Sequence, residues 1–421
     1  MNTLETDVLV CGGGCAGLAA ALAAARNHAR VLLVERAGFA GGIVTTVGLP
    51  YFDGLVDKKT NKIVLRGIPL EFLNRLGIVA PDAETVPKFH VLVDSIERFK
   101  LLADRMLAEQ SPRLSVLYHA MACGAEVVAD RIDRVLVASK DGLTAVRAKV
   151  IVDGTGDADI ACWAGAPVTK SPSLQPMTMH FRIGNVNRQP DLSAKCRDAL
   201  VRAHEAGELP LFYGPGLMFH FAPDEVYVHA TRVAGDASDP GQLTAAEMQG
   251  RRDVWTMFER WKKEVPGFED AYLIETGPYI GVRETRRIVG RYVLTEDDIK
   301  AEKPFDDAVA TGCWYLDLHP QAATPGSAQK EKGHQPGPYD IPYRSLLPQQ
   351  ITNLIVAGRC HSATQWAASS TRVTATAMAM GQAAGVAGAL AVERNVAPAE
   401  LDGRLVRQTL HQQHAGPYLR S

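Results

Sequence analysis

The sequence of 421 residues predicts an α/β protein: a parallel sheet with a β-meander, joined to an inserted α+β domain. Three observations lead to this fold class. A short apolar strand, a glycine-rich turn, an Ala-rich helix and a second strand follow one another at the N-terminus, as in a βαβ unit. Short apolar runs separated by turn residues then predict the meander. A middle region of different character precedes a buried strand and a long helix of small residues.

The elements of the first part follow from hydrophobic periodicity and turn signals. Asp141-Gly142 is a hairpin-type turn pair, and the helix expected up to residue 109 is amphipathic. The predicted elements are a strand at 7–11, a helix at 14–30, a strand at 31–35, helices at 69–76 and 94–109, and an antiparallel meander over 114–152.

The middle of the chain predicts a separate domain, because charged helical and short strand-like segments replace the earlier pattern. The length of 421 residues favours two or three domains, or one nucleotide-binding domain with a large insertion. The predicted elements here are strands at 177–183 and 226–230, a helix at 244–264, a loop at 324–337, a strand at 353–357 and a helix at 373–392. We expect a first domain at 1–166, a substrate domain at 167–338, and the return to the first domain at 339–421.

Composition excludes several classes of protein. Apolar residues make up 46% and charged residues 22% of the chain, and 45 basic against 47 acidic residues give a formal charge of −2. This balance provides no positive field for nucleic acid or an anionic membrane. Seven cysteines without a C-x-x-C pair indicate reduced thiols and a cytoplasmic protein. The uncharged stretch 373–392 consists mostly of small residues, which favours a buried helix over a membrane span.

A glycine motif gives the first functional signal. Gly12, Gly14 and Gly17 form G-x-G-x-x-G between a strand and a helix, and Glu35 ends the next strand. Such a turn brings the backbone close to a pyrophosphate at the helix N-terminus, and the acid accepts hydrogen bonds from ribose hydroxyls. The sequence therefore predicts a Rossmann-like dinucleotide site.

Further motifs carry a resemblance. After Glu35 come Arg36 and Gly41-Gly42, and later segments read DGTGD at 153–157, GVRETRRIVG at 281–290 and IPYRSLLP at 341–348, followed by residues 353–388. Together they resemble the bacterial FAD-dependent oxidoreductases of the glutathione-reductase type, distantly related to the fumarate reductase and succinate dehydrogenase flavoproteins. The resemblance implies FAD as cofactor. It also implies non-covalent binding, because no histidine lies between Arg36 and Asp53, where relatives tether the flavin.

The resemblance also implies which residues hold FAD. The first glycines would bind the pyrophosphate, Glu35 the ribose, and the strand near Ala122 the adenine. Residues 372–374 would begin a helix aimed at the flavin. The expected cofactor residues are Gly12, Gly14, Cys15, Ala16, Gly17, Glu35, Arg36, Gly41, Gly42, Ala122, Gly154, Gly156, Asp157, Gly358, Arg359, Arg372, Val373 and Thr374.

Candidates for substrate handling lie in the C-terminal half. Arg283 and Arg286 belong to a dense basic cluster that suits an anionic substrate, although Glu284 among them leaves a structural role open. Tyr343, His361 and His319 are candidates for proton transfer. His180, inside an expected strand, is interpreted as a structural histidine, and no metal-ligand motif is present in the sequence.

The leading hypothesis is a cytoplasmic FAD-dependent oxidoreductase that moves a hydride between a small, anionic organic substrate and flavin N5, with a dehydrogenase or reductase favoured. One alternative is an O2-using flavin monooxygenase or oxidase. Another is a non-catalytic FAD-binding module of a larger complex. The electron acceptor or donor is unidentified. No nucleic-acid or membrane partner is expected, and a homodimer is compatible with the sequence.

Overall fold

The structure is a computed structural model that describes residues 2–319 and 333–418. The loop predicted at 324–337 therefore lies largely outside the described residues. The main sheet has seven strands in the order β3-β2-β1-β6-β5-β4, with β15 also paired to β6. Strands β1 (Asn2–Cys11), β2 (Val31–Glu35) and β6 (Gly142–Asp153) are mutually parallel neighbours, as the N-terminal motif predicts.

One long strand joins the two kinds of pairing. The first half of β6 pairs antiparallel with β5 (Arg131–Ser139), which pairs with β4 (Met121–Val128). Its second half pairs in parallel with β15 (Leu354–Val356) from the far end of the chain. β6 therefore belongs both to the meander and to the parallel part of the sheet, where it pairs with β15.

The predicted meander began too early. β3 (Leu114–Tyr118) is not part of it, because β3 pairs in parallel with β2. The amphipathic helix α4 (Ile96–Ala108) precedes β3 and supplies the crossover that a parallel connection needs. Short apolar runs look alike in the sequence whether their neighbours run parallel or antiparallel.

Two helices pack closely on the parallel sheet. α1 (Cys15–Arg26) contacts α10 (Thr374–Arg394), and a Cβ on Gly381 would lie 2.0 Å from the carbonyl oxygen of Ala16. Small residues in α10 thus allow the two backbones to approach. α10 is the one helix in the described ranges that is long and apolar enough to cross a membrane, and 94% of its most apolar window is buried inside the protein.

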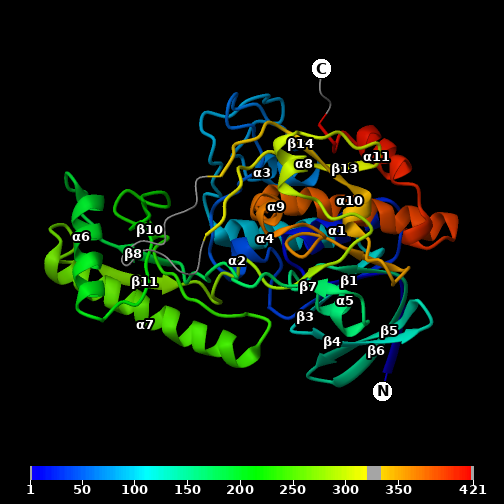
Figure 1. Cartoon of the computed structure of the whole chain (residues 1–421), viewed down its shortest axis with the longest axis horizontal. Coiled ribbons are helices and arrows are strands. Elements are labelled where there is room, and N and C mark those ends of the chain that lie inside the picture. Colours follow the sequence, from blue (N-terminus) through cyan, green and yellow to red (C-terminus); the bar gives the residue numbers. More distant parts are fainter. Residues whose placement is uncertain (1, 320–332, 419–421) are drawn as a thin grey trace.

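A second core lies beside the first, on the left in Figure 1. Its four-stranded sheet has the order β11-β8-β10-β9, covered by α6 (Leu192–Glu205) and α7 (Pro240–Glu264). The strands are β8 (Phe181–Gly184), β9 (Leu217–Met218), β10 (Val226–Val228) and β11 (Tyr272–Thr276). Buried residues from Met177 to Ile280 form this core.

The chain returns to the first core soon afterwards. Leu294 and Phe305 already belong to that core. The division at residues 167 and 338 stays a prediction, but the cores favour a return before Leu294. The remaining elements are α2 (Ile43–Thr46), α3 (Ile68–Arg75), α5 (Asp159–Trp163), β7 (Val168–Thr169), β12 (Arg287–Ile288), α8 (Glu296–Lys300), β13 (Ala308–Gly312), β14 (Tyr339–Pro342), α9 (Gln365–Thr371) and α11 (Gly403–Gln412).

Candidate functional site

A cavity of about 1060 Å³ runs from the parallel sheet to the second core. Residues that directly follow β1, β2, β6 and β15 line one end of it, so this end lies at the carboxyl ends of the parallel strands. Ligands of open α/β sheets bind at this edge. The volume reaches the upper limit of ligand pockets, about 1,000 Å³, and leaves room for a cofactor and a second small molecule.

Glycines let main-chain segments meet at this end. Gly12 has φ +96°, and a Cβ on it would lie 2.7 Å from the carbonyl oxygen of Gly154. Gly42 has φ +51°, and its Cβ would lie 2.7 Å from the Cα of Gly14. Gly14 is the N-cap of α1 and provides no side-chain cap, so the first amides of the helix are open to an anion at the cavity wall.

Acidic and basic side chains flank these amides. The Glu35 carboxylate lines the cavity and accepts hydrogen bonds from the amides of Gly13 at 2.6 Å and Ala37 at 2.8 Å. Both bonds hold it at the end of β2 with lone pairs left for a ligand. The guanidinium of Arg36 lies 5.3 Å from the ring centre of Tyr279. Ala122 lines the cavity in the adjoining meander.

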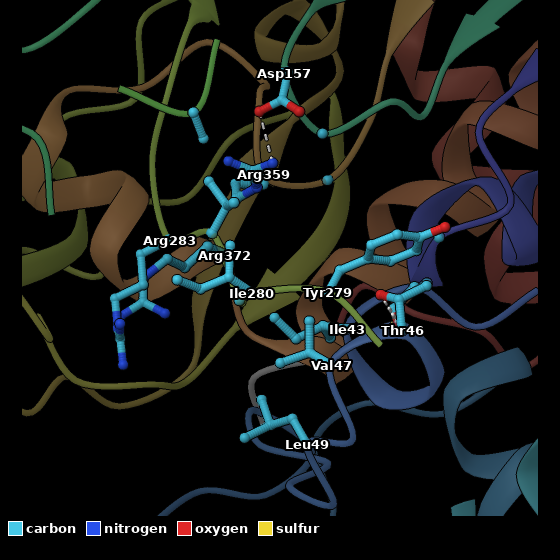
Figure 2. Close-up of a pocket in the computed structure, with 18 of the residues that line it drawn as sticks. Ile43, Thr46, Val47, Leu49, Asp157, Tyr279, Ile280, Arg283, Arg359 and Arg372 are labelled. Carbon is cyan, nitrogen blue, oxygen red and sulfur yellow. Dashed lines mark hydrogen bonds and ion pairs between the residues drawn. The ribbon is translucent and has the colours of Figure 1, made fainter. Parts of the chain in front are cut away.

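The segment after β6 is tied to the segment after β15. Asp157 accepts a hydrogen bond from Arg359 at 2.8 Å, drawn as a dashed line in Figure 2, and another from Thr285 at 2.5 Å. Gly154, Gly156 and Gly358 line the cavity beside this pair. The charge of Arg359 is therefore matched within the protein.

The N-terminus of α10 also faces the cavity. Val373 is its N-cap without a side-chain cap, and Val373 and Thr374 line the cavity. The open amides and the helix dipole favour negative charge at this point. Arg372, just before the helix, donates to the carbonyl of Asp317 at 3.2 Å.

Two predicted cofactor glycines act behind the cavity wall. Gly17 does not line the cavity; its Cβ would lie 1.8 Å from the carbonyl oxygen of Gly12, so it allows helix and strand to pack. Gly41 also lies behind the wall and accepts a hydrogen bond from the Cys15 thiol at 3.2 Å. Burial raises the pKa of Cys15, which lines the cavity beside Ala16, to about 12, so it is a neutral thiol.

The other end of the cavity is built from side chains. Arg283 donates to the carbonyl of Pro176 at 2.6 Å and to Thr178 Oγ1 at 2.7 Å. Its second terminal nitrogen lies 3.2 Å from His229 Nε2, and Arg232 lies 3.1 Å from the same atom. One neutral imidazole thus accepts from two guanidinium groups. In the described ranges, neither arginine has a carboxylate within the 4.0 Å of an ion pair.

Burial and charge change the titration of this group. The pKa of Arg283 is held well below its usual range by burial and by Arg232 and Arg372. Burial, together with Arg232 and Arg283, lowers the pKa of His180 and His229 well below the usual range, so both are neutral. The Tyr227 hydroxyl lies 2.5 Å from Nδ1 of His180 and forms a hydrogen bond with it.

His319 lines the cavity next to an acid. Its Nε2 lies 3.4 Å from Asp317 Oδ1, which favours a proton on Nε2. Its buried Nδ1 has no hydrogen-bond partner among the residues that the structure describes. Burial and Arg283 lower the pKa of His319 well below its usual range. A neutral His319 therefore offers a lone pair on Nδ1.

Two predicted catalytic residues lie elsewhere. Tyr343 is buried in the first core, does not line the cavity, and donates to the carbonyl of Pro398 at 3.0 Å. His361 is fully buried, also outside the cavity lining, with Nε2 2.7 Å from Thr371 Oγ1, and burial lowers its pKa to about 3. Both residues stand next to motif residues in the sequence, but each side chain points into the packed interior and not into the cavity.

The three arginines of the basic cluster differ in their partners. Arg286 lines the cavity but forms an ion pair with Asp159, and buried Arg287 pairs with Glu284 at 2.6 Å. Arg283 alone of the three lacks a described carboxylate partner. Figure 2 shows Arg283 and Arg372 on the same side of the cavity.

The sequence prediction missed most of this end. His180, interpreted from the sequence as a structural histidine, lines the cavity. The other missed residues are Tyr51, Asp53, His90, Tyr213, His229, Trp314 and Asp317. They come from separate segments, and no spacing in the sequence links them.

Comparison with known proteins decides the family. The family described as FAD dependent oxidoreductase matches residues 7–410. The chain belongs to this family of FAD-dependent oxidoreductases. FAD is therefore its cofactor, and the residues fit it: the open amides of α1 suit a pyrophosphate, Glu35 suits a ribose, and the open amides of α10 suit an electron-rich flavin edge.

Individual relatives are distant from this oxidoreductase. It is 32% identical over 163 residues to aklavinone 12-hydroxylase of Streptomyces peucetius subsp. caesius. The aligned region covers 36% of this chain and only 32% of that protein. A geranylgeranyl bacteriochlorophyll reductase-like protein of Thermoplasma acidophilum has a TM-score of 0.50 at 13% identity, covering 98% of this chain and 84% of that one. A p-nitrophenol 4-monooxygenase of Pseudomonas putida has a TM-score of 0.49 at 12% identity, covering 99% and 87%. The similarity to the Thermoplasma acidophilum protein concerns the fold alone. The relation to glutathione reductase and to fumarate reductase stays a prediction.

Proposed function

We propose that this FAD-dependent oxidoreductase acts on a small organic anion bound at Arg283. The observation that carries the proposal is the buried pair of Arg283 and Arg232, which share His229 and have no described carboxylate partner. Two adjacent cations away from water are costly unless an anion neutralises them. Arg283 lines the cavity, so a ligand can reach it.

The side chains divide the work. Arg283 holds and orients the anion, which converts a random encounter into a fixed geometry. His319 Nδ1 accepts a proton from the substrate, with Asp317 keeping the other proton on Nε2. FAD would supply the capacity to take up a hydride, and the open amides of α10 would hold it and favour negative charge at that point. The same groups serve the reverse direction.

An anaerobic screen tests the proposal. Hydroxy acids, amines and unsaturated acids are mixed with the FAD-loaded protein, or with its dithionite-reduced form, and the flavin absorbance is followed. We expect a change only with anions. Arg283→Gln should bind FAD normally but weaken the anion by about 10- to 100-fold, because it removes a charged hydrogen-bond partner. Exclusive turnover of neutral compounds contradicts the proposal.

The similarity to a hydroxylase favours a second candidate: use of O2 as electron acceptor, with hydroxylation or oxidation of the anion. This supports the O2-using route over the dehydrogenase expected from the sequence. Rapid mixing of the reduced protein with O2 separates the two. Fast reoxidation that depends on bound anion supports the O2 route, and slow reoxidation supports a dehydrogenase or reductase.

The location, partners and oligomeric state of the enzyme are also proposals. A cytoplasmic location, the absence of nucleic-acid and membrane partners, and a separate electron donor or acceptor rest on composition and motifs alone. A homodimer is compatible with them. Size-exclusion chromatography with light scattering measures the oligomeric state directly.

A further inference from the structure

Aromatic rings surround the substrate end of the cavity in an unbroken series. Each ring contacts the next with centres 4.7 to 6.3 Å apart, the spacing of favourable aromatic pairs. We call this series the aromatic belt; in order it consists of Trp314, His90, Tyr51, Tyr227, His180, His229, Tyr213 and His319.

The two ends of the belt lie close together in the sequence. Trp314 and His319 lie five positions apart in one segment, so the backbone joins them. Every member except Tyr227 lines the cavity. The belt residues otherwise come from both cores, which means that the two units together form one ring-lined chamber.

Polar groups within the belt point to a ligand. Trp314 is 3% exposed and lines the cavity, and its Nε1 has no hydrogen-bond partner among the described residues. Nδ1 of His319, also 3% exposed, is unpartnered in the same way. A buried N–H without a partner is uncommon in proteins and marks a position where a ligand atom can accept. The belt thus offers one donor and one acceptor in its rim.

The cationic groups of the belt lie beside His229 and Tyr213, whereas Asp53 lies 2.9 Å from Nδ1 of His90 and Asp317 lies 3.4 Å from Nε2 of His319. The Arg232 guanidinium lies 4.6 Å from the ring centre of Tyr213, and Arg283 contacts His229. The lowered pKa values of His180, His229 and His319 keep these rings neutral at ordinary pH. Beside Arg283, a ligand therefore meets the neutral rings of His180, His229 and His319.

We propose that the substrate is a planar aromatic anion, whose ring lies within the aromatic belt and whose charged group meets Arg283. This inference rests on the proposed function, because it takes the anion at Arg283 to be the substrate. Ring edges and faces contact a flat ring favourably, whereas a puckered aliphatic ring of equal charge leaves those surfaces poorly matched.

Three probes of similar size test the ring. Benzoate, cyclohexanecarboxylate and benzyl alcohol are titrated into the FAD-loaded protein, with acetate as a small anion, and binding is measured by calorimetry. We expect benzoate to bind about tenfold more tightly than cyclohexanecarboxylate, the effect of two favourable ring contacts, and benzyl alcohol to show no measurable binding. Equal binding of the two ring carboxylates overturns the inference while leaving the proposed function intact. Binding of acetate without benzoate does the same. Binding of none of the anions overturns both.

Variants locate the selectivity. Tyr213→Leu removes one half-buried ring of the belt and should reduce the preference for benzoate to less than about threefold. Arg283→Gln should weaken both carboxylates equally, leaving the preference unchanged. Tyr272→Leu, at a tyrosine 58% exposed on β11, is the control and should change neither. An unchanged preference in both Tyr213→Leu and Trp314→Leu excludes the belt as its source.

Discussion

The two ends of the cavity are built by different means. At the cofactor end the contacts come from the main chain: close-packed glycines and the open amides of α1 and α10. At the substrate end they come from side chains on scattered segments, namely rings, histidines and arginines. Main-chain contacts suit one ligand of fixed shape. Side chains can change without moving the backbone, so the substrate end can differ where the cofactor end stays the same.

Charge follows the same division. At the cofactor end Asp157 pairs with Arg359, and Asp159 pairs with Arg286. At the substrate end Arg283 and Arg232 share two neutral partners, the His229 imidazole and the Thr178 hydroxyl. The cofactor end is electrostatically complete apart from the anion it binds at helix termini. The substrate end needs a charged ligand to become complete.

The largest expected effect is loss of FAD at the main-chain end. In Gly14→Glu a carboxylate would occupy the space in front of the α1 amides, and the variant should purify without flavin absorbance. Gly14→Ala is the matched control, because its Cβ would meet nothing closer than 3.8 Å. It should keep most of the flavin. Circular dichroism checks that both variants fold, and a yellow, folded Gly14→Glu protein contradicts the cofactor assignment.

A smaller effect is expected where α1 and α10 support that end. Gly381→Ala places a Cβ 2.0 Å from the Ala16 carbonyl oxygen, whereas Gly388→Ala meets side chains at 3.5 Å or more. The first should lower the free energy of unfolding by about 1 to 3 kcal/mol through overpacking. The second should raise it by up to about 1 kcal/mol through helix propensity. Denaturant unfolding at saturating FAD measures both. Equal stabilities show that the close approach of the helices is not essential.

The difference between the ends also explains what the sequence could predict. One βαβ unit contains Gly12, Gly14, Gly17 and Glu35, so their spacing in the sequence predicts that they lie together before any tertiary contact is known. The parallel sheet and α10 are predictable for the same reason. His319 and Arg283 were found by residue type.

The aromatic belt has no such local signal. His90 contacts Tyr51 and Trp314, whereas His180 and His229 contact each other within the segment of the second core. The two groups are joined by the contact of Tyr51 with Tyr227, which no spacing in the sequence indicates. Tyr343 and His361 show the converse error. They stand next to motif residues in the sequence, yet packing turns their side chains away from the cavity. Adjacency along the chain fixes the backbone position, not the direction of a side chain.

The smallest expected effect concerns a buried charge in the second core, which supplies side chains to the substrate end. Asp253 on α7 is 1% exposed; Gln249 donates to its Oδ1 at 2.6 Å, and Oδ2 has no described partner. Burial raises its pKa from 3.8 to about 6. The folded state therefore binds a proton that the unfolded state has already released between these values, so this group makes stability fall as the pH rises from about 4 to about 6.

Asp253→Asn should remove this fall in stability with rising pH. The variant and the wild type should differ little at pH 4, and at pH 7 the variant should be more stable by at most about 3 kcal/mol, the equivalent of two pKa units. Asp297→Asn, the same substitution at a side chain 87% exposed on α8, is the control for loss of a surface carboxylate. Denaturant unfolding at several pH values measures each difference. If the difference in unfolding free energy between Asp253→Asn and the wild type stays constant with pH, the second core has no uncompensated charge at this position. The electrostatic difference between the two ends of the cavity would then rest on Arg283 and Arg232 alone.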